Sequence, residues 1–280
     1  MSPSDAAGFR TADDVPLELR EDLAGLLLSL ADNKRLLGMR YSEWLLGAPT
    51  LEAGIACSAM AQDEWGHSRI LYAMLKDFGE DPGHLEHERD ATEYLNCELL
   101  DDPPDKWTGL VALNALLDTA LSVQMASLKD SRFEPLHYKV RKVLEEERFH
   151  FEHGRGWLAR MGQTPAGRTA LEEALSPAWQ SCLRWFGAPD GGLIARLHAA
   201  GMSDAGPDEL RVRWIQRVGP MVHETGLGLA ELDESGAWVS AMELDWSDWD
   251  GARRRSGGGA LNAETLAGVR GDKNRTMLMD

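Results

Sequence analysis

Apolar residues, mostly leucine and alanine, recur every three or four positions along most of the chain, and runs of β-branched residues are scarce. This spacing is typical of helices that bury one or more faces, whereas strands alternate apolar and polar residues. The pattern predicts four long helices and then shorter ones. Their ranges are 16–46, 50–78, 107–129 and 135–161, followed by about 165–187, 190–200 and 207–230. We therefore expect an all-α protein.

Residues that start and stop helices support these boundaries. Thr50 is suited to cap the second helix, and Gly79 and Gly162 follow the ends of the second and fourth helices. Residues 79–106 contain three prolines and form a long connection, with a short helix predicted near 90–99. A ferritin-like bundle needs one long connection to bring its second helical hairpin beside the first. The predicted fold is a ferritin-like four-helix bundle with additional C-terminal helices and an extended tail.

Composition divides the chain into three parts. We expect residues 1–16 to form a loose leader, 17–232 the helical domain and 233–280 a C-terminal arm. From residue 234 onward, tryptophans stand among acidic residues, and runs of three arginines and three glycines follow. Such a tail usually packs on its own domain, although its arginines could meet a partner or an anionic ligand.

The charge and the cysteines narrow the classes of function. The 280 residues carry a formal net charge of −17, which argues against nucleic-acid binding because phosphates require a basic surface. Cys57, Cys97 and Cys182 are far apart, which indicates reduced thiols in the cytoplasm and not a disulfide framework or a zinc site. The polar N-terminus lacks the apolar core of a signal peptide, and no apolar run approaches eighteen residues. We expect a cytoplasmic protein that does not enter a membrane.

Two motifs of the form Glu-x-x-His carry the candidate chemistry. Glu64 and His67 form the first, and Glu147 and His150 form the second. A separation of three residues places both side chains on one face of a helix, one turn apart. Two such helices, with one carboxylate from each of two further helices, make the ligand set of di-iron and di-manganese carboxylate proteins. The repeated motif therefore predicts a two-metal centre.

The first hairpin offers a candidate for the third carboxylate. Residues equally far from the turn of an antiparallel hairpin lie side by side, so Glu64 and the turn at 47–50 together lead to Asp32. Glu43 is on the same face, but it lies ~16 Å nearer the turn at 1.5 Å per residue. We therefore prefer Asp32 as the ligand, with Glu43 as the alternative.

The second hairpin offers the fourth carboxylate by the same argument. Reflecting Glu147 through the turn near 131–135 leads to Asp118, which stands in an apolar stretch. A carboxylate there would be costly without a partner, and a cation is the natural one. The two hairpins have nearly equal ligand spacings, 32 residues from Asp32 to Glu64 and 29 from Asp118 to Glu147.

Each of these residues also has an ordinary structural interpretation. The acidic run 145–147 could be a solvated helix face. Asp32 could pair with a lysine or arginine one turn on, and His67 and His150 could be core histidines with satisfied hydrogen bonds. All of these coincidences would have to occur together, so the metal centre is the favoured interpretation.

With these residues in hand, the chain resembles the phenylacetyl-CoA epoxidase family of bacterial di-iron monooxygenase components. The family includes a catalytic subunit and a related structural subunit without metal. Segments 31–38 and 41–44 are similar to the opening hairpin of the structural subunit, whereas 62–67 and 146–150 resemble the metal motifs of the catalytic subunit. The likeness covers about residues 20–230.

The resemblance implies two iron ions, with O₂ as the cosubstrate. Iron suits a site of imidazole and carboxylate ligands with open positions, although manganese or a mixed pair stays open. Glu64 and Glu147 would bridge the two ions as the catalytic pair. Asp32 and Asp118 would bind one ion each, and His67 and His150 would complete the set. In the catalytic subunit, however, the ligand on the first helix is a Glu that aligns near Lys34 or Arg35 here.

The resemblance also implies a substrate and partners. The substrate would be an aryl-acyl-CoA such as phenylacetyl-CoA, converted to a ring epoxide. Electrons would come from an external reductase, because the chain has neither a glycine-rich dinucleotide loop nor a set of iron–sulfur cysteines. A homodimer or a hetero-oligomer with related subunits is expected. The alternatives are a di-iron oxidase for another small molecule, a metal-storage protein, and a scaffold subunit with a vestigial metal site.

Overall fold

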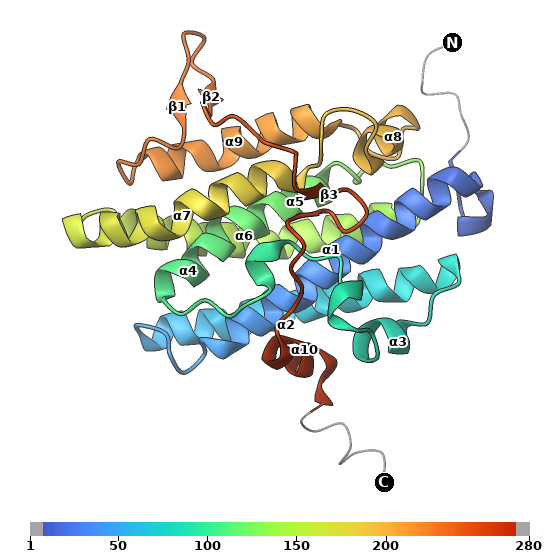
Figure 1. Ribbon diagram of the computed structural model, residues 1–280, viewed down its shortest axis with the longest axis horizontal. Helices are drawn as coiled ribbons and strands as arrows, with labels where there is room; N and C mark the ends of the chain where they lie inside the picture. Colours follow the sequence, from blue (N-terminus) through green and yellow to red (C-terminus); the bar gives the residue numbers. More distant parts are fainter. Residues whose placement is uncertain (1–7, 273–280) are drawn as a thin grey trace. The chain divides into compact units, whose positions relative to one another are not determined.

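The computed structural model of the protein describes residues 8–272 (Figure 1). The chain is all-α, as predicted, and its long helices are those of a ferritin-like bundle. The described residues fall into two compact units. Unit 1 comprises residues 8–14 and Lys106–Ser247, and unit 2 comprises Val15–Asp105 and residues 248–272.

Unit 2 is built on a helical hairpin. Its two helices are α1 (Leu17–Glu43) and α2 (Leu51–Leu75), which pack along each other. Thr50 caps α2 as predicted, because its Oγ1 accepts a hydrogen bond from the Ala53 amide at 3.2 Å. A Cβ at Gly54 would lie 2.5 Å from the carbonyl oxygen of Leu45, so glycine allows the two helices to approach closely at this turn.

Helix α1 is buried on more than one side, as its many leucines predicted. Six of them are fully buried: Leu23, Leu26, Leu27, Leu30, Leu36 and Leu37. The same helix carries polar residues into the core, and Asp32, Asn33 and Lys34 are also fully buried. Buried charges on α1 must therefore be paired within the protein.

The remainder of unit 2 consists of short elements. They are η3 (Lys76–Phe78), α3 (Pro82–His87), η4 (Ala91–Glu93), η5 (Glu98–Leu100), β3 (Trp249–Asp250), β4 (Arg255–Ser256) and α10 (Ala263–Arg270). The helix predicted near 90–99 is replaced by two separate 3₁₀ turns, η4 and η5. Part of the predicted arm is also folded, since the Arg35 guanidinium donates to the Val269 carbonyl of α10 at 2.7 and 3.0 Å.

Unit 1 contains two long helices and several shorter helical elements. They are α4 (Trp107–Ala112), η6 (Leu113–Asp118), α5 (Thr119–Ala126), α6 (Leu136–Met161), α7 (Pro165–Trp185), α8 (Leu193–Ala199) and α9 (Pro207–His223), preceded by η2 (Ala12–Asp14). The predicted helix 107–129 is present, but its middle third, η6, is a π-helix. The helix predicted over 207–230 ends earlier, at His223, and a short hairpin of β1 (Glu231–Leu232) and β2 (Trp238–Val239) follows.

One helix in the described part of the chain, Trp107–Ala126, is long and apolar enough to cross a membrane by length and composition alone. The sequence-based expectation of no such segment was therefore too strict. The apolar window of this helix is 89% buried in the structure, and a core helix gives the same signal.

Candidate metal centre

Unit 1 holds a buried cluster of Asp118, Glu147 and His150. Each of the three offers a ligand atom that lies within 4.8 Å of the other two. The Nδ1 atom of His150 is 2.9 Å from Oδ2 of Asp118 and 3.8 Å from Oε2 of Glu147. None of the three side chains is more than 3% exposed. Of the predicted site residues, these three are brought together within one unit.

Ser122 adds a contact that the sequence analysis missed. Its hydroxyl donates a hydrogen bond of 2.8 Å to Oε2 of Glu147. Ser122 lies four residues after Asp118 and thus on the same helix face, which is the one sequence signal that could have found it. The hydroxyl fixes one oxygen of Glu147, as outer hydrogen bonds commonly do for carboxylates that bind metal.

The π-helix η6 ends at Asp118, and π segments within α-helices occur frequently at functional sites. Asn114, inside this segment, joins it to α6. Its amide donates to the His150 carbonyl at 3.2 Å, and its Oδ1 lies 3.2 Å from Nδ1 of His153. Glycine at position 154 allows the two helices to approach closely here, because a Cβ on this residue would lie only 2.8 Å from Oδ1 of Asn114. These contacts hold the helix of Asp118 against the helix of Glu147 and His150.

His153 stays neutral behind this cluster. Its Nε2 accepts a hydrogen bond of 3.2 Å from the Trp157 indole, so Nδ1 carries the proton that is donated to Asn114. Burial, and to a smaller degree the neighbouring His150, lower the pKa of His153 from 6.5 to about 4.

Unit 2 holds the other Glu-x-x-His motif on α2. Glu64 and His67 are both buried, and Nδ1 of His67 lies 4.0 Å from Oε2 of Glu64. The other oxygen of Glu64, Oε1, accepts a hydrogen bond of 2.9 Å from the ammonium of Lys34 on α1. Both side chains of this ion pair are fully buried. Helical periodicity did not predict the contact of Lys34 with Glu64, although the resemblance placed a ligand of the first helix near this position.

The structure does not place Asp32 in a metal-ligand cluster among the described residues. Its carboxylate pairs instead with the guanidinium of Arg89, accepts a hydrogen bond of 2.6 Å from the Tyr72 hydroxyl and accepts another of 2.8 Å from the Leu95 amide. The ordinary interpretation of Asp32 as half of an ion pair therefore fits, but the partner lies in the long connection and not one turn on. Burial and the Asp32 charge raise the pKa of Tyr72 well above 10.

Glu43 does not supply the missing ligand either. Its Oε1 accepts a hydrogen bond of 2.7 Å from Nη1 of Arg40, and its side chain is 35% exposed. Burial raises the pKa of Glu43, which Arg40 partly offsets. The two carboxylates considered on α1 thus both face arginines.

The fit to a metal therefore differs between the two Glu-x-x-His motifs. Asp118, Glu147 and His150 offer two carboxylates and one imidazole at short mutual distances, which suits a divalent ion such as iron. At Glu64 the position of a neighbouring cation is taken by an ammonium. The residues fit one ion in unit 1 well, and the six-ligand set predicted for two ions is incomplete on α1.

Comparison with known proteins decides the family. Residues 6–241 match the family model of the phenylacetic acid catabolic protein. The chain belongs to this family. It is also similar to one of the subunits of 1,2-phenylacetyl-CoA epoxidase from Escherichia coli K12, with 26% identity over 212 residues, which cover 75% of this chain and 84% of that relative. Membership of the phenylacetic acid catabolic protein family confirms the resemblance drawn from the motifs.

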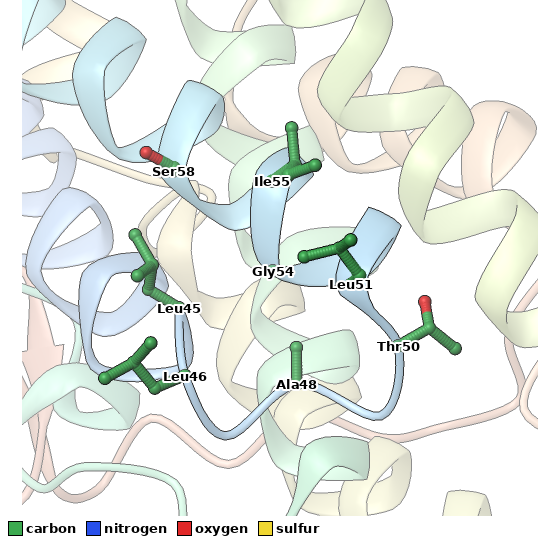
Figure 2. A pocket seen from close by; sticks show the side chains of 8 residues that line it. All are labelled: Leu45, Leu46, Ala48, Thr50, Leu51, Gly54, Ile55 and Ser58. Atoms are coloured by element: carbon green, nitrogen blue, oxygen red, sulfur yellow. The ribbon is translucent and has the colours of Figure 1, made fainter.

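A pocket at the surface of unit 2 lies at the turn between α1 and α2. Figure 2 shows its lining side chains: Leu45, Leu46, Ala48, Thr50, Leu51, Gly54, Ile55 and Ser58. Leu46, Leu51 and Ile55 are 95%, 77% and 62% exposed. Exposed apolar patches of this kind often mark sites of protein association.

Proposed function

We propose that the chain is the metal-binding, O₂-activating subunit of a monooxygenase complex that acts on an aryl-acyl-CoA such as phenylacetyl-CoA. The observation that carries the proposal is the buried cluster of Asp118, Glu147 and His150 in a member of the phenylacetic acid catabolic protein family. The relative is named as one subunit of 1,2-phenylacetyl-CoA epoxidase, and this name supports the substrate class and a hetero-oligomer with related subunits.

In this proposal, the chain's residues hold iron and keep it away from water. Asp118, Glu147 and His150 would bind the metal, with Ser122 orienting Glu147. Glu64 and His67 are counted as further ligands because the motif is repeated in the sequence. Bound iron would supply the redox chemistry that reduces O₂ and transfers one oxygen atom to the aromatic ring.

The balance of the reaction requires a reductase. One oxygen atom enters the ring as an epoxide and the other leaves as water, so two electrons and two protons are consumed for each O₂. The three cysteines of the chain are buried and far apart in the sequence, and they are not arranged as an iron–sulfur set. An external reductase would therefore deliver the electrons, and reduced thiols are consistent with a cytoplasmic location.

A second candidate, a scaffold subunit of such a complex with a vestigial metal site, is favoured by the ion pairs on α1. Lys34 pairs with one oxygen of Glu64, and Arg89 pairs with Asp32. Buried carboxylates that are already paired with protein cations have less need of an added ion.

Anaerobic loading with Fe(II) separates the two candidates. Iron per chain, Mössbauer spectra and O₂ consumption would be measured for the parent chain and for an Asp118→Ala, Glu147→Ala double variant. The matched control is Asp130→Ala, Glu145→Ala, which removes the same two residue types from exposed positions. Iron that O₂ oxidises, lost in the first variant and kept in the second, supports a functional metal centre.

The substrate requires a second assay with related subunits and a reductase present. Phenylacetyl-CoA and free phenylacetate would be compared as substrates. Oxygenated product from the CoA thioester, dependent on Asp118 and Glu147, supports the proposed reaction. A parent chain that binds no iron, in a complex that is active without an intact cluster, would establish the scaffold role.

A further inference from the structure

We propose that the ammonium of Lys34 stands in the place of one metal ion beside Glu64, so that the chain holds at most one ion, bound at Asp118, Glu147 and His150. The inference rests on the proposed function only in taking this cluster as the metal-binding one. It lowers the number of metal ions expected from the sequence from two to one.

The geometry of the ion pair is the first support. The Lys34 Nζ atom lies 2.9 Å from Oε1 of Glu64, and neither side chain is exposed to solvent. A lysine ammonium is a compact point charge, and a buried carboxylate requires a cation nearby. A divalent ion bound at the same oxygen would have this ammonium as an immediate neighbour, and like charges repel strongly in the low dielectric of a protein interior.

The two carboxylates on α1 that the sequence suggested as metal ligands are also paired within the protein. Asp32 is held by Arg89 and Tyr72, and Glu43 is held by Arg40. The hairpin also leaves the helices little freedom to rearrange here, because a Cβ at Gly38 would lie only 2.6 Å from the ring of Trp65. Lys34 and Glu64 are thus built into a tightly packed interface between α1 and α2.

The cluster in unit 1 is the place for the single ion. Imidazole and carboxylate groups are both ordinary protein ligands of divalent transition-metal ions. Asp118, Glu147 and His150 provide both, with ligand atoms within 4.8 Å of one another.

The test counts metal ions in the full-length chain. The parent, Lys34→Glu and the control Lys106→Glu would each be incubated anaerobically with Fe(II), and separately with redox-inert Zn(II), and then freed of unbound metal. Lys106 is 61% exposed, so the control makes the same chemical change at the surface. Elemental analysis gives ions per chain, and thermal unfolding with and without metal gives the stabilisation by binding.

We expect no more than one ion in the parent and in Lys106→Glu, and one additional ion in Lys34→Glu. The unfolding midpoint of Lys34→Glu should rise with added metal by more than that of the parent. Two ions in the parent, or an unchanged count in folded Lys34→Glu, would overturn the inference. If Lys34→Glu does not fold without metal, it would be refolded with Zn(II), and the count in the parent remains decisive.

The outcomes also separate this inference from the proposed function. A parent with one ion and no oxygenated product would keep the role of Lys34 and remove the catalytic assignment. A parent with two ions and a product would do the reverse.

Discussion

Asp32 and Lys34 lie only two positions apart on α1, and it is the Lys34 ammonium, not the Asp32 carboxylate, that contacts Glu64. Two residues correspond to about 200° of rotation around a helix, so the two side chains leave it on nearly opposite sides. Reflection through the hairpin turn locates the level of an opposing residue along the axis but not its direction around the axis. The partner of Asp32, Arg89, is 57 residues away in the long connection, where helical periodicity carries no information.

Replacing Lys34 with methionine should destabilise the metal-free protein by about 3–5 kcal/mol, because the Glu64 charge would be left buried without its cation. Denaturant unfolding of chelator-treated protein measures this loss. Lys106→Met removes an exposed ion pair with Glu173 and should cost less than about 1 kcal/mol. A further Glu64→Leu change in the Lys34→Met background should recover most of the stability. Equal effects of Lys34→Met and Lys106→Met would show that the buried pair is not energetically important.

Among the elements, the long helices were predictable and the π segment was not. Leucine and alanine spacing, with Thr50 as a cap, predicted the helices of both hairpins within a few residues. The π segment, by contrast, has no periodic signal in the sequence. It is accompanied by a contact between η6 and α6, in which the Asn114 amide donates a hydrogen bond to the His150 carbonyl close to Gly154. The position of Asp118 therefore depends on tertiary packing more than on the local sequence.

Adding a methyl group at Gly154 tests this packing. A Cβ there would lie 2.8 Å from Oδ1 of Asn114 and 3.0 Å from Cα of Ala115, so Gly154→Ala should force α6 away from η6 and cost about 1–3 kcal/mol. Metal affinity should fall with it. Gly156→Ala, two residues on, meets nothing within 4 Å and should stabilise the exposed helix by about 0.5–1 kcal/mol. Thermal unfolding and metal titration of both variants measure the difference, and parallel behaviour of the two would contradict the proposed contact.

The same helix pair should lose stability in acid through His153. The unfolded chain binds a proton at this residue with a pKa near 6.5, whereas the folded chain binds it only near 4. Protons therefore favour the unfolded state as the pH falls from 6.5 to 4, by about 1–2 kcal/mol after allowance for partial exposure. His153→Gln can keep both hydrogen bonds and should flatten this part of the stability curve. An unchanged curve in His153→Gln would rule out this origin.

For the whole molecule, composition and periodicity were enough to predict the fold class, but the short elements depend on distant contacts. The β3–β4 hairpin lies in the predicted arm, where Arg255 pairs with Asp101, 154 residues earlier in the chain. A strand of two residues has too little pattern to be recognised from sequence. The family was predictable because its two Glu-x-x-His motifs are short and local, whereas the cation beside Glu64 became evident only when α1 and α2 were seen packed together.

The apolar pocket at the α1–α2 turn should be part of the surface that binds a related subunit. The relative is named as one subunit of an epoxidase, and Leu46 is 95% exposed in the pocket of Figure 2. Because burying such a side chain in a complex is favourable and burying a charge is not, Leu46→Glu should weaken association about tenfold or more. Val212→Glu, at an exposed apolar position on α9, is the matched control and should bind normally. Biolayer interferometry against the related subunits gives both affinities, and equal binding by the two variants would place the partner elsewhere on the molecule.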